Sequence, residues 1–211
     1  MVKVALAKGR LEEEAFPFLE RCGFRFEEKG ERSLIVTDIE ESLKIFIVKP
    51  ADVPTYVSSG VVDVGICGTD SIVESQLKLI QPMKLPFGRA RMVVAGFEGF
   101  RMKNGTVTVA TKFPVSAKMY FDSKGVDVKI VKLNGSVELA PLVGLAPLIV
   151  DIVQTGKTLR ENGLSILDEI YPINAIVALN DVSYRIKREE ILRFLERLER
   201  GCGREDLDRT R

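Results

Sequence analysis

Short apolar runs alternate with amphipathic stretches along most of the 211-residue chain. Residues 2–7 read as a buried strand, and the stretch that follows places five apolar residues at helical spacing: Leu11, Ala15, Phe18, Leu19 and Cys22. The alternation continues towards the C-terminus. This order of elements is typical of an α/β fold with largely parallel strands.

Further strands are predicted wherever β-branched and apolar residues cluster, namely at 33–38, 44–48, 61–66, 91–96, 107–111, 126–133, 148–152, 165–171 and 175–179. Asp52 precedes Val53-Pro54 and suits the N-cap of a helix, because proline is tolerated in the first turn. Residues 185–200 predict one amphipathic helix, with an apolar face formed by Ile191, Leu192, Leu195 and Leu198.

Two breaks in this pattern suggest that the chain crosses between two lobes. Residues 82–88 are rich in proline, glycine and basic side chains, and Tyr171-Pro172 offers a second crossing. We therefore expect one lobe formed by residues 1–84 together with 173–211, and a second formed by residues 85–172. Ligands usually bind in the cleft between two such lobes.

Composition excludes several classes of function. The 31 Lys and Arg residues nearly balance the 30 Asp and Glu residues, so there is no electrostatic case for nucleic acid or a membrane surface as partner. No apolar run approaches a membrane span, and the first residues show no secretory cleavage pattern, so a cytoplasmic protein is expected. The chain has no histidine, which excludes His-dependent triads. The three cysteines suggest neither a disulfide framework nor a zinc site.

Residues 148–159 carry the most informative pattern: an apolar strand ends in an acid, and a Thr/Gly loop then opens a helix. Gly156 would let the backbone approach an anion, and the hydroxyls of Thr155 and Thr158 could donate to it. Asp151 could accept from sugar hydroxyls or hold the water shell of Mg²⁺. The loop lacks the spacing of a Walker motif. The alternative is an ordinary strand-to-helix turn capped by threonine.

An acid followed by Thr-Gly-x-Thr-Leu resembles the 5-phosphoribosyl diphosphate loop of phosphoribosyltransferases. Their common Rossmann-like class has two adjacent acids there, whereas this chain has Ile152 in the second position. The run 133–141, followed by Gly144-Leu145-Ala146, is similar to the ATP phosphoribosyltransferase family, the first enzymes of histidine biosynthesis. Further segments match in the family's order, namely Lys8-Gly9-Arg10-Leu11, 52–57, 63–66, 68–70 and 110–114.

The resemblance implies a two-lobed fold like that of type II periplasmic binding proteins, with a cleft between the lobes. It also implies transfer of the 5-phosphoribosyl group from 5-phosphoribosyl diphosphate to N1 of ATP, with Mg²⁺ as cofactor. The chain looks like the family's short form, so we expect a homodimer that joins a regulatory subunit resembling histidyl-tRNA synthetase. Pro147 stands where the family usually carries an acid.

The resemblance also implies roles for individual residues. Catalytic residues are expected to be Lys8, Arg10 and Arg32. The 5-phosphoribosyl diphosphate site is expected to comprise Glu138, Asp151, Thr155, Gly156, Lys157, Thr158 and Leu159. ATP is expected to contact Lys8, Gly9, Arg10, Asp70 and Thr111, and no separate protein metal site is assigned.

Each role has a simpler alternative in the residues themselves. Lys8 and Arg10 could form a solvated turn, and Arg32 could be a solvated strand end. Asp70 could cap the following helix, and Glu138 could stabilise a helix terminus. A second hypothesis for the whole chain is a cytoplasmic small-molecule-binding or sensor module on the same two lobes, since fold does not determine function.

Overall fold

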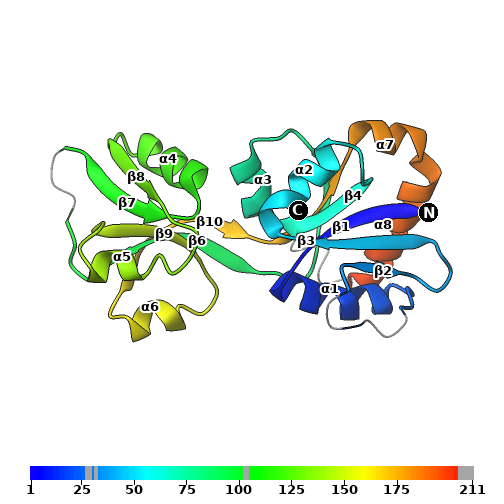
Figure 1. Ribbon diagram of the computed structural model, residues 1–211, viewed down its shortest axis with the longest axis horizontal. Helices are drawn as coiled ribbons and strands as arrows, with labels where there is room; N and C mark the ends of the chain where they lie inside the picture. The colour runs from blue at the N-terminus through cyan, green and yellow to red at the C-terminus, as the bar shows by residue number, and fades with distance from the viewer. Residues whose placement is uncertain (27–29, 31–32, 102–104, 204–211) are drawn as a thin grey trace. The chain divides into compact units, whose positions relative to one another are not determined.

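The structure, a computed structural model, describes residues 1–26, 30, 33–101 and 105–203 (Figure 1). The chain forms two compact units. Unit 1 comprises Met1–Gly88 and the residues from Asn174 onward, and unit 2 comprises Arg89–Ile173. The sequence predicts these crossings after residues 84 and 172. Each unit is built on one β-sheet.

Unit 1 contains a six-stranded sheet in the order β2-β3-β1-β4-β11-β5. Strand β1 pairs in parallel with β3 and β4, while β2, β5 and β11 pair antiparallel with their neighbours. The carboxyl ends of β3, β1 and β4 therefore share one edge. The strands are β1 (Val2–Ala7), β2 (Ile35–Thr37), β3 (Leu43–Val48), β4 (Val64–Gly68), β5 (Ile80–Lys84) and β11 (Ala175–Leu179).

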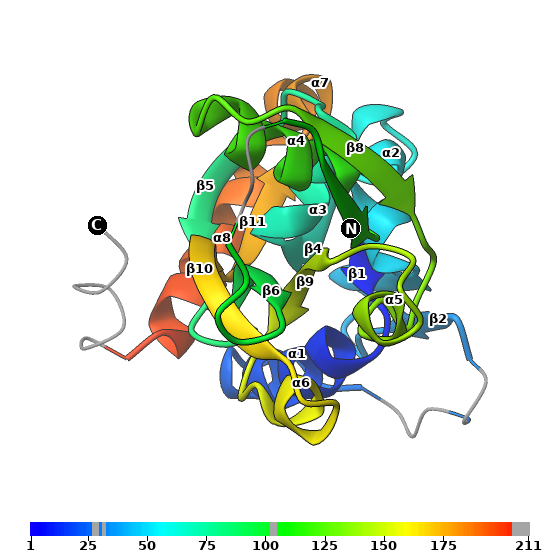
Figure 2. The same cartoon turned by 90° about the vertical axis from the view of Figure 1, so that its left-hand side faces the viewer.

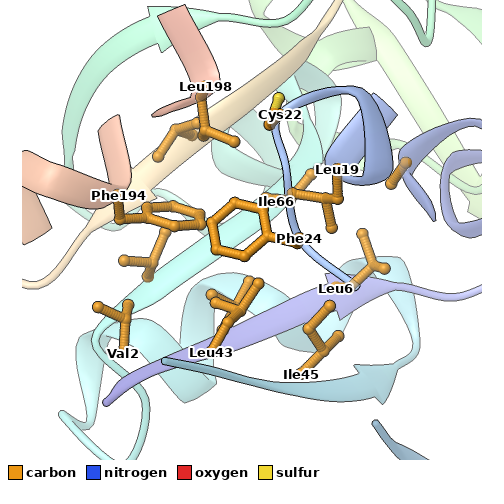
Figure 3. Close-up of a cluster of buried hydrophobic side chains, with 14 of the residues drawn as sticks. Val2, Leu6, Leu19, Cys22, Phe24, Leu43, Ile45, Ile66, Phe194 and Leu198 are labelled. Atoms are coloured by element: carbon orange, nitrogen blue, oxygen red, sulfur yellow. The ribbon is translucent and has the colours of Figure 1, made fainter. Parts of the chain in front are cut away.

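Helices α1 and α8 bury apolar faces in the main core of unit 1. Val2, Leu6, Leu43, Ile45 and Ile66 of the sheet meet side chains of α1, α8 and the segment after α1, among them Leu19, Phe24, Phe194 and Leu198 (Figure 3). The helices of this unit are α1 (Arg10–Arg21), α2 (Val53–Ser58), α3 (Thr69–Ser75), α7 (Asp181–Ile186) and α8 (Arg188–Gly201), with a 3₁₀ turn at Pro50–Asp52.

Unit 2 contains a five-stranded sheet in the order β10-β6-β9-β7-β8. Strands β8, β7 and β9 are parallel, and β6 runs antiparallel to both β9 and β10. The strands are β6 (Ala90–Gly96), β7 (Val107–Thr111), β8 (Val128–Lys132), β9 (Leu148–Val153) and β10 (Ser165–Ile173). Three helices complete the unit: α4 (Pro114–Ser123), α5 (Leu139–Leu142) and α6 (Lys157–Glu161).

Apolar residues cover both faces of the unit 2 sheet, because successive side chains of a strand point to opposite faces. Met92 and Val94 of β6 pack in the cluster that contains Phe121 of α4, whereas Val93 packs in the cluster that contains Leu159 of α6. Helices α4 and α6 accordingly lie on opposite sides of the sheet (Figure 2).

Two local predictions were wrong, one predicted N-cap position is confirmed, and one strand was missed. The single helix expected at 185–200 is two helices, because Asn180 caps α7 early by accepting from the Ser183 amide at 2.8 Å, and Lys187 separates α7 from α8. The strand expected at 61–66 lies at Val64–Gly68, and Asp52 occupies an N-cap position without a side-chain capping bond. Strand β5 was not predicted, because its side chains are mostly exposed and show no apolar pattern.

None of the helices in the described part of the chain combines the length and apolar character that a membrane crossing requires.

Candidate functional site

The parallel strands of unit 2 bring three loops to one edge of the sheet. The carboxyl ends of β8, β7 and β9 point the same way, so the segments that follow them begin at this edge. Glu138 follows β8, Lys112 follows β7, and the Thr/Gly loop follows β9. Open α/β sheets commonly bind ligands outside the carboxyl ends of their strands.

A pocket of about 420 Å³ opens at this edge and lies wholly within unit 2. All seven residues expected at the 5-phosphoribosyl diphosphate site line this pocket. Its lining residues are Glu138, Asp151, Ile152, Val153, Gln154, Thr155, Gly156, Lys157, Thr158 and Leu159. Pro147 is exposed and is not among them. Gln154 was not singled out from the sequence, and its position between Asp151 and Thr155 was the available signal.

The loop after β9 depends on glycine at position 156. Gly156 has φ +72°, a left-handed conformation that side chains disfavour, and it is buried. A Cβ there would lie 3.1 Å from Arg160 Nη1, and the same nitrogen donates to the Thr155 carbonyl at 3.0 Å. Gly156 itself is the N-cap of α6, which has no side-chain capping bond. Thr155 Oγ1 does accept from the Lys157 amide at 3.4 Å, so a threonine hydroxyl supports the turn, although the N-cap residue itself is Gly156.

Asp151 carries a perturbed carboxyl group on the wall of the pocket. Burial raises its pKa to about 6, and the nearby Glu138 carboxylate acts in the same direction. The Ile152 amide, which donates to Asp151 Oδ1 at 2.8 Å, and the charge of Lys112 oppose the rise. The side chain therefore changes charge near neutral pH, and its carboxylate form is available to accept from hydroxyls or to bind a cation.

Glu138 stands at the N-cap position of α5 but makes no side-chain capping bond. Its side chain is half-buried and lines the pocket with Asp151. Within the described ranges, no group of three or more acids or cysteines could bind a metal ion unaided. Two carboxylates do fit Mg²⁺, which is usually held by one or two carboxylates plus substrate phosphates.

The side chain of Thr111 is not available to contact ATP. The residue is completely buried, and its hydroxyl donates to the Val150 carbonyl at 2.6 Å while accepting from the Phe113 amide at 2.8 Å. Both hydrogen-bonding functions are thus used to join β7 to β9 and to the turn before α4. The expectation for Thr111 is corrected: its side chain has a structural role.

In unit 1, Lys8, Gly9 and Arg10 follow β1 directly. The Lys8 amide donates to the Val48 carbonyl at 2.8 Å, which ties this turn to the end of β3. Gly9 has φ +93°, and its amide donates to Glu12 Oε2 at 3.2 Å. Lys8 and Gly9 are exposed and Arg10 is partly exposed, so all three remain accessible to an anionic ligand.

Asp70 lies beyond the end of β4, at the same edge of the sheet as Arg10. It is buried, and burial raises its pKa, while hydrogen bonds from the backbone of Asp70 and Ser71 oppose the rise. The N-cap of α3 is Gly68, so the Asp70 carboxylate accepts hydrogen bonds from first-turn amides at a position within the helix and not at its N-cap. Arg32, expected to be catalytic, lies outside the described residues.

Comparison with known proteins identifies the family. The family model described as ATP phosphoribosyltransferase (HisG) matches residues 49–200. The chain belongs to the ATP phosphoribosyltransferase family. An ATP phosphoribosyltransferase from Thermotoga maritima is 46% identical over 211 residues, which is the whole of both chains. One from Thermotoga neapolitana is 48% identical over 199 residues, or 94% of each chain.

Solved structures agree with this membership. The ATP phosphoribosyltransferase (HisG:HisZ) complex from T. maritima matches with a TM-score of 0.85 and 47% identity, covering 95% of this chain and 98% of that chain. Two more distant structures show the fold alone: Tv2483 bound to L-arginine, with a TM-score of 0.53 and 12% identity, and the periplasmic VFT2 domain of Bordetella pertussis BvgS, with 0.56 and 16%. The expected two-lobed α/β fold of the periplasmic binding protein type is confirmed.

Proposed function

We propose that this chain transfers the 5-phosphoribosyl group from 5-phosphoribosyl diphosphate to N1 of ATP. The products are N1-(5-phosphoribosyl)-ATP and pyrophosphate, and the reaction is the first step of histidine biosynthesis. The observation that carries the proposal is the unit 2 pocket, in which the Thr/Gly loop and two carboxylates line one space in a chain of this family.

The Thr/Gly loop would bind the 5-phosphate. The left-handed Gly156 turns the backbone tightly there, and the exposed Thr155 and Thr158 place hydroxyls beside it. Hydroxyl and amide donors form strong hydrogen bonds to charged phosphate oxygens. Lys157 is exposed, with Nζ 3.7 Å from Glu161, and can add a positive charge near the loop.

Asp151 and Glu138 would bind the ribose hydroxyls and Mg²⁺. Both side chains line the pocket beside the loop, and two carboxylates suit a cation that also binds substrate phosphates. When bound, Mg²⁺ would neutralise charge on the departing pyrophosphate. Protonation of Asp151 would weaken both interactions, so the ionised form is the one that serves the reaction.

Lys8, Gly9 and Arg10 would bind the phosphates of ATP and the pyrophosphate. The planar guanidinium of Arg10 can donate two parallel hydrogen bonds to phosphate oxygens, and Lys8 contributes a mobile charge. The amide of Gly9 lies in the same exposed turn. Asp70, at the same sheet edge, remains a proposed ATP contact, and Arg32 remains a predicted catalytic residue.

The chemistry requires positioning and charge stabilisation rather than a base. N1 of the adenine is a neutral nitrogen that attacks C1 without first losing a proton, while the bond from C1 to the pyrophosphate oxygen breaks. C1 passes through an oxocarbenium-like state, as in glycoside chemistry. Cationic and hydrogen-bonding side chains lower the barrier by holding the reactants and stabilising the leaving group. A chain without histidine can supply all of these functions.

The assembly we propose is a homodimer that joins a HisZ-type regulatory subunit, and the HisG:HisZ complex of the T. maritima relative supports the second part of this proposal. This subunit would resemble histidyl-tRNA synthetase. We further propose that the enzyme works in the cytoplasm, where ATP is available. No nucleic acid or membrane is needed for the reaction.

The test is product formation from ATP, 5-phosphoribosyl diphosphate and Mg²⁺. The purified chain is assayed alone and after co-purification with its HisZ-type partner, with product absorbance and pyrophosphate release as readouts. We expect both signals to require both substrates and to increase with the partner. Absence of both signals in the complex would reject the proposal and favour the small-molecule-binding or sensor module.

A further inference from the structure

Glu14 connects two parts of unit 1 through the two oxygens of one carboxylate. Oε1 lies 3.7 Å from Nε of Arg10, one helical turn earlier on α1. Oε2 accepts a hydrogen bond of 2.8 Å from the amide of Gly88, which is 74 residues away in sequence. Gly88 is the last residue of unit 1 before the chain enters unit 2. One side chain thus links the proposed phosphate-binding arginine to the segment by which the chain leaves the unit.

The amide of Gly88 is itself held in place by close packing. Gly88 has φ +70°, and a Cβ there would lie 2.5 Å from Leu11 Cδ2 and 2.9 Å from Ala175 Cβ. Backbone hydrogen bonds join the same segments: the Leu85 amide donates to the Ala175 carbonyl at 2.8 Å, and the Ala175 amide donates to Phe87 at 3.2 Å. The donor that holds the carboxylate therefore has little freedom to move.

We propose that Glu14 is a positioning residue for Arg10 in the transfer reaction, and that Gly88 anchors it. The inference rests on the proposed function. Contact through Nε leaves the two terminal nitrogens of the guanidinium to face phosphate oxygens. An exposed ion pair of the i,i+4 type usually contributes little, because ordering two flexible side chains costs entropy. Here the Gly88 amide already orders the carboxylate, so only Arg10 remains to be fixed.

The pairing predicts a loss of turnover without a loss of substrate affinity. Removing the negative charge frees the Arg10 guanidinium to meet phosphates, so substrate affinity should not fall. The freed guanidinium samples more orientations, so fewer bound complexes have the geometry that the reaction needs. Glu14→Gln is the informative change, because the amide oxygen of glutamine can still accept from Gly88 while the charge is lost.

The experiment compares Glu14→Gln with Glu13→Gln in the complex with the HisZ-type subunit. Glu13 is the matched control, since it is exposed on the same helix and loses the same charge. We expect kcat of Glu14→Gln to fall roughly 10-fold, while KM for ATP stays within about twofold and the thermal midpoint matches that of the control. Glu13→Gln should retain wild-type kinetics.

A double-mutant cycle with Arg10→Ala distinguishes positioning from a general structural role. If Glu14 acts through Arg10, adding Glu14→Gln to Arg10→Ala should cause no further loss of kcat. A full additional loss, or kinetics of Glu14→Gln equal to those of Glu13→Gln, would overturn the inference. Failure of the proposed function would look different, because the wild-type complex would then form no product at all.

Discussion

The two sheets present similar edges with different chemistry. In each unit three parallel strands, β3-β1-β4 in unit 1 and β8-β7-β9 in unit 2, bring their following loops to one edge. The unit 1 edge carries Lys8 and Arg10 in an exposed turn. The unit 2 edge carries Asp151 and Glu138 beside a glycine loop, in a defined pocket. The parallel strands position the loops at one edge, and the residues of the loops determine which ligand can bind there.

Burial separates the two edges further. Lys8 and Arg10 at the unit 1 edge are accessible cations, which suits the phosphates of ATP and pyrophosphate. Burial brings the pKa of Asp151 in unit 2 to about 6, so its charge depends on pH. The comparison therefore predicts that mutations at the two edges change the kinetic constants of the two substrates differently. It also predicts that they change the pH dependence of activity differently.

The largest effect is expected for Arg10→Ala. Loss of a guanidinium that stabilises the departing pyrophosphate should lower kcat/KM by roughly 100-fold to 1,000-fold. The free energy of unfolding should change by less than about 1 kcal/mol, because the ion pair of Arg10 with Glu14 is partly exposed. Steady-state kinetics and thermal unfolding measure the two quantities.

Arg185→Ala is the matched control for this prediction. Arg185 also forms an i,i+4 ion pair, with Asp181 on α7, and its side chain is 77% exposed. The control should retain activity. Early unfolding of Arg10→Ala, with kinetics restored at low temperature, would show that Arg10 is structural and that the edge of unit 1 has no phosphate-binding role.

The second effect concerns pH. The value of kcat/KM for 5-phosphoribosyl diphosphate should fall by up to about tenfold for each pH unit below about 6, because protonated Asp151 binds the ribose and Mg²⁺ more weakly. Asp151→Asn should lose this acid limb, whereas Asp122→Asn, on an exposed carboxylate of α4, should retain it. An acid limb that persists in Asp151→Asn would assign the titration to another group.

The contribution of Asp151 to stability should depend on pH with the opposite sign to its contribution to activity. The folded pKa of Asp151 lies above its ordinary value of 3.8, so the folded chain binds more protons than the unfolded chain between about pH 4 and pH 6. The contribution of this group to the free energy of unfolding therefore decreases as pH rises through that window. Denaturant unfolding of Asp151→Asn should show less of this decrease than the wild type.

A third, smaller effect is expected for the loop hydroxyls. Thr155→Ala and Thr158→Val should each raise KM for 5-phosphoribosyl diphosphate by about 10-fold, because a hydrogen bond to a charged oxygen is lost. KM for ATP should stay within about twofold, since ATP is assigned to the other edge. Equal losses for both substrates would reject the division of labour between the two units.

Local sequence patterns predicted the loop after β9 in unit 2 better than they predicted Thr111, the cap of α7 or strand β5. The strand, the acid and Gly156 are adjacent in sequence, and a left-handed glycine after a strand is recognisable without tertiary information. Thr111 was assigned wrongly, because its burial depends on pairing between β7 and β9, whose paired residues are 39 positions apart. The capping of α7 by Asn180 and the exposed edge strand β5 were missed because neither leaves an apolar periodicity.

The smallest effects should come from the glycines of the two edges. Gly9 and Gly156 both have positive φ, so alanine at either position should cost about 1–2 kcal/mol of unfolding free energy. A Cβ at Gly9 meets nothing within 4 Å, whereas at Gly156 it meets Arg160 Nη1 at 3.1 Å, which holds the Thr155 carbonyl. Gly156→Ala should therefore raise KM for 5-phosphoribosyl diphosphate more than Gly9→Ala does, because the 5-phosphate is assigned to the Gly156 loop alone. Equal KM values in the two variants would show that the loop tolerates displacement of Arg160, and that its shape is not what binds the phosphate.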